Sequence, residues 1–172
     1  MSLDTAASLN GSRVFLQLSA SPAEEAPSAV LQQARERAAA SGLSYAGDVT
    51  PEEAHALVAA GFARLIDVRT PEERKFVGYA SNSVHIAWAT GTAFARNPRF
   101  LRELEAKTRK DEVLLMLCRS GSRSVAAAEA ATRAQFGQVF NVLEGFEGEL
   151  NANGRRNSSG GWKFRGLPWT QD

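Results

Sequence analysis

Short apolar runs alternate with helix-forming stretches along most of this chain. The runs FARLIDV (62–68), VLLML (113–117) and QVFNVL (138–143) lack a clean polar alternation, which is typical of strands covered on both faces. Two weaker runs, VFLQL (14–18) and SVHIAW (83–88), also predict short strands. Because helical segments separate these strands, the pattern predicts an α/β protein with a parallel sheet.

Helix signals lie between the apolar runs. The motif TPEE occurs at 50–53 and again at 70–73, and it combines an N-cap threonine, a proline at the first helical position and a capping-box glutamate. The first box predicts a helix over 51–60, and the second predicts another short helix. The alanine-rich stretch 124–136 predicts a longer helix, and Asn97-Pro98 predicts the cap of a further one.

The first part of the chain has a different character. The segment PSAVLQQARERAAA (27–40) is rich in helix formers and predicts a helix across the outside of the domain, or alternatively a partner-binding helix. With 172 residues, of which 44% are hydrophobic, the chain is long enough for one domain plus an extension. We therefore expect an N-terminal extension over 1–44 and one domain over 45–172, with a long loop at 149–161.

Charge and composition narrow the function classes. Twenty basic and nineteen acidic residues leave a net charge of +1, so no large field points to a nucleic-acid or membrane partner. No stretch approaches the roughly 20 apolar residues of a membrane span or has the form of a signal peptide, so we expect a cytoplasmic protein. One cysteine excludes an intramolecular disulfide, and the distance between His55 and His85 in sequence argues against a zinc site. We expect no metal and no cofactor.

The single cysteine, Cys118, follows the most apolar run and precedes RSGSRS and the alanine-rich helix. In a parallel sheet this position is at the carboxyl edge, where open α/β sheets bind ligands. Such a loop can turn backbone N–H groups inward, and the helix N-terminus adds roughly half a positive charge, so we expect it to bind anions. Arg119 and Arg123 should further favour the nucleophilic thiolate. A cysteine after a strand is often a small buried hydrophobe, but this polar, basic loop favours a catalytic or anion-binding site.

The spacing within the loop separates two chemistries. Phosphatases of the cysteine type use Cys-x5-Arg, whereas here position 124 is serine and the arginine stands at 123, giving Cys-x4-Arg. In the shorter loop the backbone donors converge closer to the thiol. This arrangement suits an extra sulfur atom on the cysteine better than a bound tetrahedral phosphate.

Several blocks of the sequence carry a resemblance to a known family. CRSGSR (118–123) resembles the active-site loop of the rhodanese, or thiosulfate sulfurtransferase, domain family. LIDVRTPEERKFVGYASNSVHIAW (65–88) is similar to a second family signature; it matches at Asp67, Val68, Arg69, Glu73, Gly78 and Ile86, and departs at Tyr79, Ala80, Asn82, His85 and Ala87. FNVLEGF (140–146) and GGWKFRGLPW (160–169) resemble the family's late strand and closing pattern, which makes 149–161 an insertion. The resemblance implies a rhodanese-like three-layer α/β/α sandwich.

The resemblance also implies a two-step sulfur transfer in which Cys118 is the catalytic residue. Its thiolate takes sulfur from thiosulfate or another small anionic donor, and a thiol or cyanide acceptor, possibly a protein, then removes that sulfur. The expected substrate-binding residues are those of the loop: Arg119, Ser120, Gly121, Ser122 and Arg123. Asp67 and Arg69 are expected to support the site, with Asp67 bound to the loop or its arginine and Arg69 paired with Glu72 or Glu73.

Alternatives remain at this point for both the residues and the function. Arg119 or Arg123 can instead be held in a structural ion pair with Asp67 or a glutamate. One of the tryptophans, Trp88, Trp162 or Trp169, is a candidate for a pocket wall. A sulfur-carrier or binding module would use the same residues and deliver its sulfur to a protein partner. A phosphatase or arsenate reductase of the same fold is the weaker alternative, because the loop is short.

Overall fold

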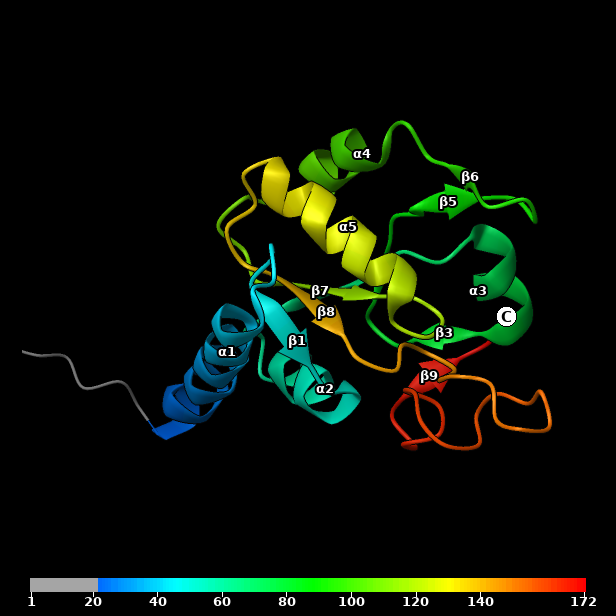
Figure 1. The fold of residues 1–172 in the computed structure, drawn as a ribbon, viewed down its shortest axis with the longest axis horizontal. Coiled ribbons are helices and arrows are strands. Elements are labelled where there is room, and N and C mark those ends of the chain that lie inside the picture. The colour runs from blue at the N-terminus through cyan, green and yellow to red at the C-terminus, as the bar shows by residue number, and fades with distance from the viewer. Residues whose placement is uncertain (1–21) are drawn as a thin grey trace, which may run out of the picture.

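A five-stranded parallel sheet lies at the centre of residues 22–172, the part of the chain that the computed structural model describes. The strand order is β1-β8-β7-β2-β4. Figure 1 labels β1, β8 and β7 as neighbours in this sheet. The strands are β1 (Gly47–Val49), β2 (Arg64–Asp67), β4 (Val84–His85), β7 (Leu114–Leu117) and β8 (Val139–Val142). The three main predicted strands are confirmed with shorter bounds, the run at 83–88 contributes only β4, and the run at 14–18 lies outside the described residues.

Helices cover both faces of this sheet (Figure 1). Residues of α4 (Phe100–Lys107) and α5 (Ser122–Arg133) form one core with Leu114 and Met116, whereas residues of α1 (Pro22–Ser41) and α2 (Pro51–Ala59) form the other with Leu115 and Leu117. Alternate β7 side chains therefore enter opposite layers, as the pleat requires. Cys118 continues the alternation and belongs to the core on the α5 side. The predicted three-layer α/β/α sandwich is confirmed.

Both predicted capping boxes are present. The Thr50 hydroxyl accepts the N–H of Glu53 at 3.2 Å, and the Glu53 carboxylate accepts the N–H of Thr50 at 2.8 Å. Thr70 and Glu73 make the same reciprocal pair at 3.2 and 2.9 Å, at the start of α3 (Pro71–Val77). Each box satisfies two backbone donors locally, which explains why the starts of α2 and α3 are readable from the sequence.

Two predicted helix starts were wrong. Helix α4 begins at Phe100 with Arg99 as its N-cap, and Asn97 instead accepts the Arg99 N–H at 3.0 Å in a turn before the helix. Helix α5 begins at Ser122 rather than at residue 124, because Gly121 adopts a left-handed conformation (φ 101°) that serves as the N-cap. The serines and arginine of the loop's end therefore already belong to the first turn of α5.

Helix α1 contains the predicted 27–40 segment and is longer at its N-terminal end. Its buried Leu31, Ala34 and Ala38 face the sheet. Contact with β1 is close: a Cβ on Gly47 would lie 2.5 Å from the carbonyl oxygen of Ala34. The helix thus forms part of one core layer, while the division into an extension and a domain at residue 45 stays a prediction.

Two small antiparallel ribbons, which the sequence patterns did not predict, complete the fold. β3 (Tyr79–Ala80) pairs with β9 (Trp169–Thr170), and β5 (Ala89–Thr90) pairs with β6 (Ala95–Arg96). Residues 149–161, all within the described part, contain neither helix nor strand. No helix among the described residues is long and apolar enough to cross a membrane.

Candidate active site

Cys118 lies directly after β7, in the loop that leads into α5. The residue is only 1% exposed, yet it lines a surface pocket of about 360 Å³. The other lining residues are Phe94, Arg119, Ser120, Ser122 and Arg123. Four of the five predicted loop residues therefore line the same pocket as the sulfur, and Gly121, together with Ser120 and Ser122, lines a second, smaller pocket.

Two polar groups at the start of α5 lie close to the sulfur. The Gly121 N–H lies 3.1 Å from Cys118 Sγ, and the Ser124 hydroxyl oxygen lies 3.2 Å from the same atom. The helix N-terminus adds its partial positive charge at this place. Ser124 was not among the predicted site residues, because it stands one residue beyond the CRSGSR motif. Its place one residue after the second arginine, in the first turn of the helix, was the available signal.

The turn that follows β8 is hydrogen-bonded to the backbone of the cysteine loop. The Phe146 N–H donates to the Cys118 carbonyl at 2.8 Å, and the Glu147 N–H donates to the Arg119 carbonyl at 2.9 Å. This approach requires a glycine at position 145, because a Cβ there would lie 2.6 Å from the Cys118 oxygen and φ is +64°. The turn at residues 144–146, after β8, thus fixes the backbone of the cysteine loop.

Arg123 forms an ion pair with the carboxylate of Glu73. Its two guanidinium nitrogens donate to the Glu73 oxygens at 2.7 and 2.6 Å, and its guanidinium carbon lies 5.0 Å from the centre of the Phe94 ring. Burial alone would raise the pKa of Glu73, but the bonds from Arg123 and from the Thr70 N–H hold it below its usual value. Of the alternatives left open for Arg123, the structure shows the ion pair with a glutamate.

Arg119 is much less engaged. Its side chain is 38% exposed, and its Nε lies 4.0 Å from the nearest Glu73 oxygen. This nitrogen is buried and has no hydrogen-bond partner among the described residues. Since Arg119 also lines the pocket, its guanidinium is available to an anion that enters beside Cys118.

Asp67 and Arg69 lie beneath the site and do not line its pocket. Both are fully buried, and Arg69 donates to the two Asp67 oxygens at 3.0 and 2.7 Å. Arg74 donates to the same carboxylate at 2.8 Å. Burial would raise the pKa of Asp67, but the two guanidinium groups hold it below its usual value. Both expected contacts were wrong: among the described residues Asp67 is bound to Arg69 and Arg74 and not to the loop or Arg123, and Arg69 is not paired with Glu72 or Glu73. The reason is that Asp67 and Arg69 lie two positions apart at the end of the same strand.

The aromatic wall of the pocket is Phe94 and not a tryptophan. Phe94 lies in the turn between β5 and β6 with φ 52° and is 44% exposed. Trp88 packs edge-on against Phe100, Trp162 is buried, and Trp169 belongs to β9. Within residues 22–172 no group of three histidine, cysteine or acidic residues is placed to hold a metal ion.

Comparisons with known proteins agree with this geometry. A family model described as Rhodanese-like domain matches residues 50–152. The crystal structure of Rv0390 from M. tuberculosis is 42% identical, with a TM-score of 0.68, over 74% of this chain and 99% of its own. The uncharacterized protein RC0915 of Rickettsia conorii is 34% identical over 112 residues, 62% of this chain and 82% of its own. The chloroplastic thiosulfate sulfurtransferase 16 of Arabidopsis thaliana is 30% identical over 95 residues, 54% of this chain and 78% of its own.

Proposed function

Because this chain belongs to the rhodanese-like domain family, we propose that it is a thiosulfate sulfurtransferase that works through a Cys118 persulfide. The observation that carries the proposal is the position of the sulfur in the pocket wall. The Gly121 N–H and the start of α5 lie on one side of it, and the uncommitted Arg119 lies beside it. The similarity to the Arabidopsis thaliana thiosulfate sulfurtransferase 16 supports the choice of donor.

The proposed first step transfers one sulfur atom. The Cys118 thiolate attacks the outer sulfur of thiosulfate, a new S–S bond forms on Cys118, and the original S–S bond breaks with its electron pair leaving on sulfite. The negative charge then resides on the outer sulfur of the persulfide. In the second step a thiolate or cyanide takes that outer sulfur, and the electron pair of the broken bond returns to Cys118. The cycle is ping-pong.

The loop residues supply binding and charge stabilisation. Arg119 orients the anionic donor, and the backbone N–H groups at the start of α5 stabilise the negative sulfur as an oxyanion hole stabilises an oxygen. Arg123 acts mainly through its ion pair with Glu73, which fixes the first turn of α5 against α3. No general base is required when the thiolate forms before the donor binds.

Intact-protein mass spectrometry after incubation with thiosulfate tests the proposal. We expect a gain of one sulfur atom that cyanide removes and that is absent from the Cys118→Ser variant. A folded protein that gains no sulfur from thiosulfate or from an organic persulfide would contradict it, and phosphate esters would then be the next substrates to test.

The same preparation separates an enzyme from a sulfur carrier. A sulfurtransferase that uses small acceptors turns over repeatedly when a small thiol is supplied. A carrier accepts sulfur once and retains it until a protein acceptor is added. The rate at which a small thiol removes the persulfide therefore decides between the two.

A further inference from the structure

The Ser124 hydroxyl lies among more hydrogen-bond acceptors than it can serve. Its oxygen is 2.6 Å from Asn141 Oδ1, 2.9 Å from the Gly121 carbonyl oxygen and 3.2 Å from Cys118 Sγ. Ser124 and Asn141 are both buried. Because a hydroxyl carries a single hydrogen, it can donate fully to one of these atoms, and the shortest contact is the one to Asn141.

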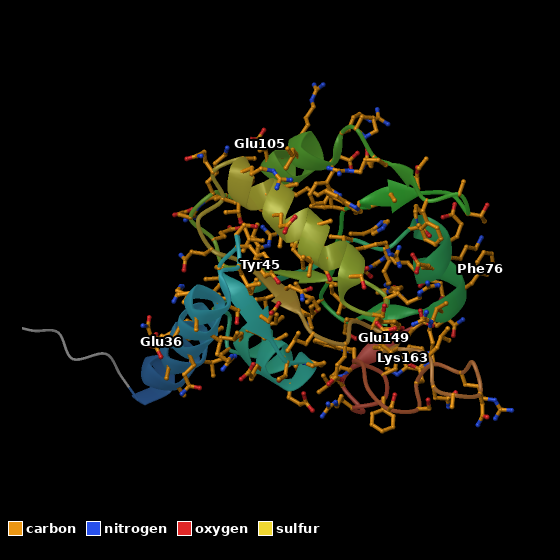
Figure 2. The ribbon with its side chains drawn as sticks, in the orientation of Figure 1. Glu36, Tyr45, Phe76, Glu105, Glu149 and Lys163 are labelled. Carbon is orange, nitrogen blue, oxygen red and sulfur yellow. The ribbon has the colours of Figure 1, made fainter. Side chains whose placement is uncertain are left out.

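The orientation of the Asn141 amide is set by Asp48. The amide nitrogen lies 2.9 Å from Asp48 Oδ1, and a carboxylate only accepts, so the amide oxygen must face Ser124. Tyr45, which lies just before β1 (Figure 2), donates to the same Asp48 oxygen at 3.0 Å. Burial, together with the hydrogen bond and charge of Asp48, raises the pKa of Tyr45, so its hydroxyl remains a donor.

This chain of contacts suits some states of the cysteine better than others. In the thiol state Cys118 donates to Ser124, Ser124 donates to Asn141, and Asn141 donates to Asp48, so each donor has an acceptor. In the thiolate state the sulfur needs the hydroxyl hydrogen, and moving that hydrogen leaves a buried amide oxygen without a donor. In a persulfide Sγ is bonded to carbon and sulfur, and the charge lies on the outer sulfur, so Sγ needs no donor.

We propose that Asp48 and Asn141 are positioning residues that direct the Ser124 hydroxyl hydrogen to the Asn141 amide oxygen instead of the Cys118 sulfur. This arrangement disfavours the free thiolate relative to the thiol and the persulfide. The network acts against the loop arginines and the α5 N-terminus, whose positive charge stabilises the thiolate. It protects the resting cysteine from alkylation and keeps a bound sulfur in place. The statement about the persulfide rests on the proposed function, whereas the statement about the thiol does not.

Other charged groups surround the sulfur and must stay unchanged in a test. Arg119 and Arg123 belong to the loop and the start of α5, and Glu73 on α3 is bound to Arg123. Beneath the loop, Asp67 is paired with Arg69 and Arg74. Substitution of Asn141 alters none of these charges, so a change in the reactivity of Cys118 would report on the hydroxyl.

The first test measures the rate of Cys118 alkylation by iodoacetamide against pH. In Asn141→Leu only the Gly121 carbonyl at 2.9 Å still competes with the sulfur for the hydroxyl hydrogen, and a charged thiolate is the stronger acceptor. We therefore expect the pH midpoint of alkylation to fall by about one unit, the effect of one hydrogen bond to a charged group. Ser124→Ala should cause a smaller fall, because the bond to the thiol is lost but no donor is gained. The double variant should match Ser124→Ala.

Controls distinguish this role from a general loosening of the fold. Thr132→Val removes another hydroxyl of α5, which has no hydrogen-bond partner among the described residues, and should leave the midpoint unchanged. If Asn141→Leu fails to fold, Asp48→Ala releases the amide to rotate and serves instead. Asp48→Ala also removes a negative charge, and this electrostatic effect on the midpoint should persist when Ser124 is alanine. The part of the effect that acts through the Ser124 hydroxyl should disappear in that double variant. An unchanged or higher midpoint in the folded variants would overturn the proposal.

The second test measures the persulfide fraction at a fixed ratio of thiosulfate to sulfite. Measured about one pH unit above the wild-type alkylation midpoint, where the unloaded enzyme is mainly thiolate, this equilibrium should shift about tenfold toward the unloaded enzyme in Asn141→Leu, matching one pH unit of thiolate stabilisation. If alkylation shifts as expected but the wild-type protein takes up no sulfur, the proposed function fails and the network stands. If sulfur loads but neither the midpoint nor the equilibrium moves, the network proposal fails and the function stands.

Discussion

At the scale of single residues, the two arginines of the cysteine loop have different tasks. Arg123 makes two short bonds to Glu73, whereas Arg119 has a nitrogen without a partner among the described residues and faces the same pocket. The sequence treats them alike, because the partner of Arg123 is 50 positions away. Only the fold shows which of the two guanidinium groups is bound to a carboxylate.

We therefore expect Arg119→Ala to lower kcat/KM for thiosulfate by about 10- to 100-fold, the loss of one charged hydrogen bond. Arg123→Ala should instead reduce the free energy of unfolding by about 1–3 kcal/mol, because it leaves the Glu73 carboxylate without its partner. Steady-state kinetics and urea unfolding measure the two effects. Arg133→Ala, an exposed arginine of α5, is the control. A larger loss of kcat/KM for thiosulfate in Arg123→Ala than in Arg119→Ala would contradict these different roles of the two arginines.

A half-buried histidine predicts a pH dependence of stability. His85 Nε2 lies 2.8 Å from the Arg69 carbonyl oxygen, and burial holds the pKa of His85 below its ordinary value of 6.5. The folded state therefore favours neutral His85, so stability is complete above pH 6.5 and falls as the pH drops from there through the folded value. Urea unfolding at pH 7.5 and at about pH 5 should show a smaller loss in His85→Gln than in the wild type. Equal losses in both proteins would exclude this role.

At the scale of elements, the cysteine loop is held by the turn that follows β8. Gly145→Ala should destabilise the protein and abolish sulfur loading, because its Cβ would meet the backbone of Cys118, Arg119 and Ser120. Gly154→Ala is the matched control: its φ is +70°, but a Cβ there would meet no atom within 4 Å. It should cost only about 1–2 kcal/mol for the left-handed backbone and leave sulfur loading intact. Urea unfolding and mass spectrometry would show the difference, and equal effects would contradict the proposed contact.

Elements were predictable from the sequence where local chemistry determines them. The boxes at Thr50 and Thr70 act within one turn, and the long apolar runs carry their own signal, so α2, α3, β2, β7 and β8 follow from the sequence. The strands β3, β5, β6 and β9 contain two residues each, too few to show a period. They can be recognised only from their pairing, which joins β3 to β9 near the end of the chain and β5 to β6 across a short turn. The same reason hides Phe94, because the β5–β6 hairpin brings it to the pocket.

The candidate site was predictable to a similar degree. The cysteine, its loop and the two supporting residues are adjacent in two short motifs. Ser124, Asn141 and Asp48 come from three separate elements, and only their hydrogen bonds connect them. A residue that acts through another residue leaves no spacing signature in a single sequence.

At the scale of the whole molecule, helix α1 is part of the core layer on one face of the sheet. Leu31 is 6% exposed, and Gln33 on the same helix is exposed, as is Glu36 on the outer surface (Figure 2). We expect Leu31→Ala to lower the free energy of unfolding by about 2–4 kcal/mol, and Gln33→Ala to change it little. Unfolding should remain one transition in both variants. A separate early transition in Leu31→Ala would instead mark 1–44 as an independent extension.

Because the side chains of β7 alternate between two core layers, insertions in this strand affect the position of Cys118. Leu114, Met116 and Cys118 share one layer, and Leu115 and Leu117 share the other. A residue that lies an even number of positions before Cys118 in β7 therefore faces the same layer as the sulfur, and one that lies an odd number before it faces the opposite layer. A one-residue insertion in β7 would turn the thiol to the layer of α1 and α2, away from the start of α5, whereas a two-residue insertion would restore its direction. A sequence that keeps the whole CRSGSR motif can therefore still misplace its thiol if β7 gains or loses a single residue.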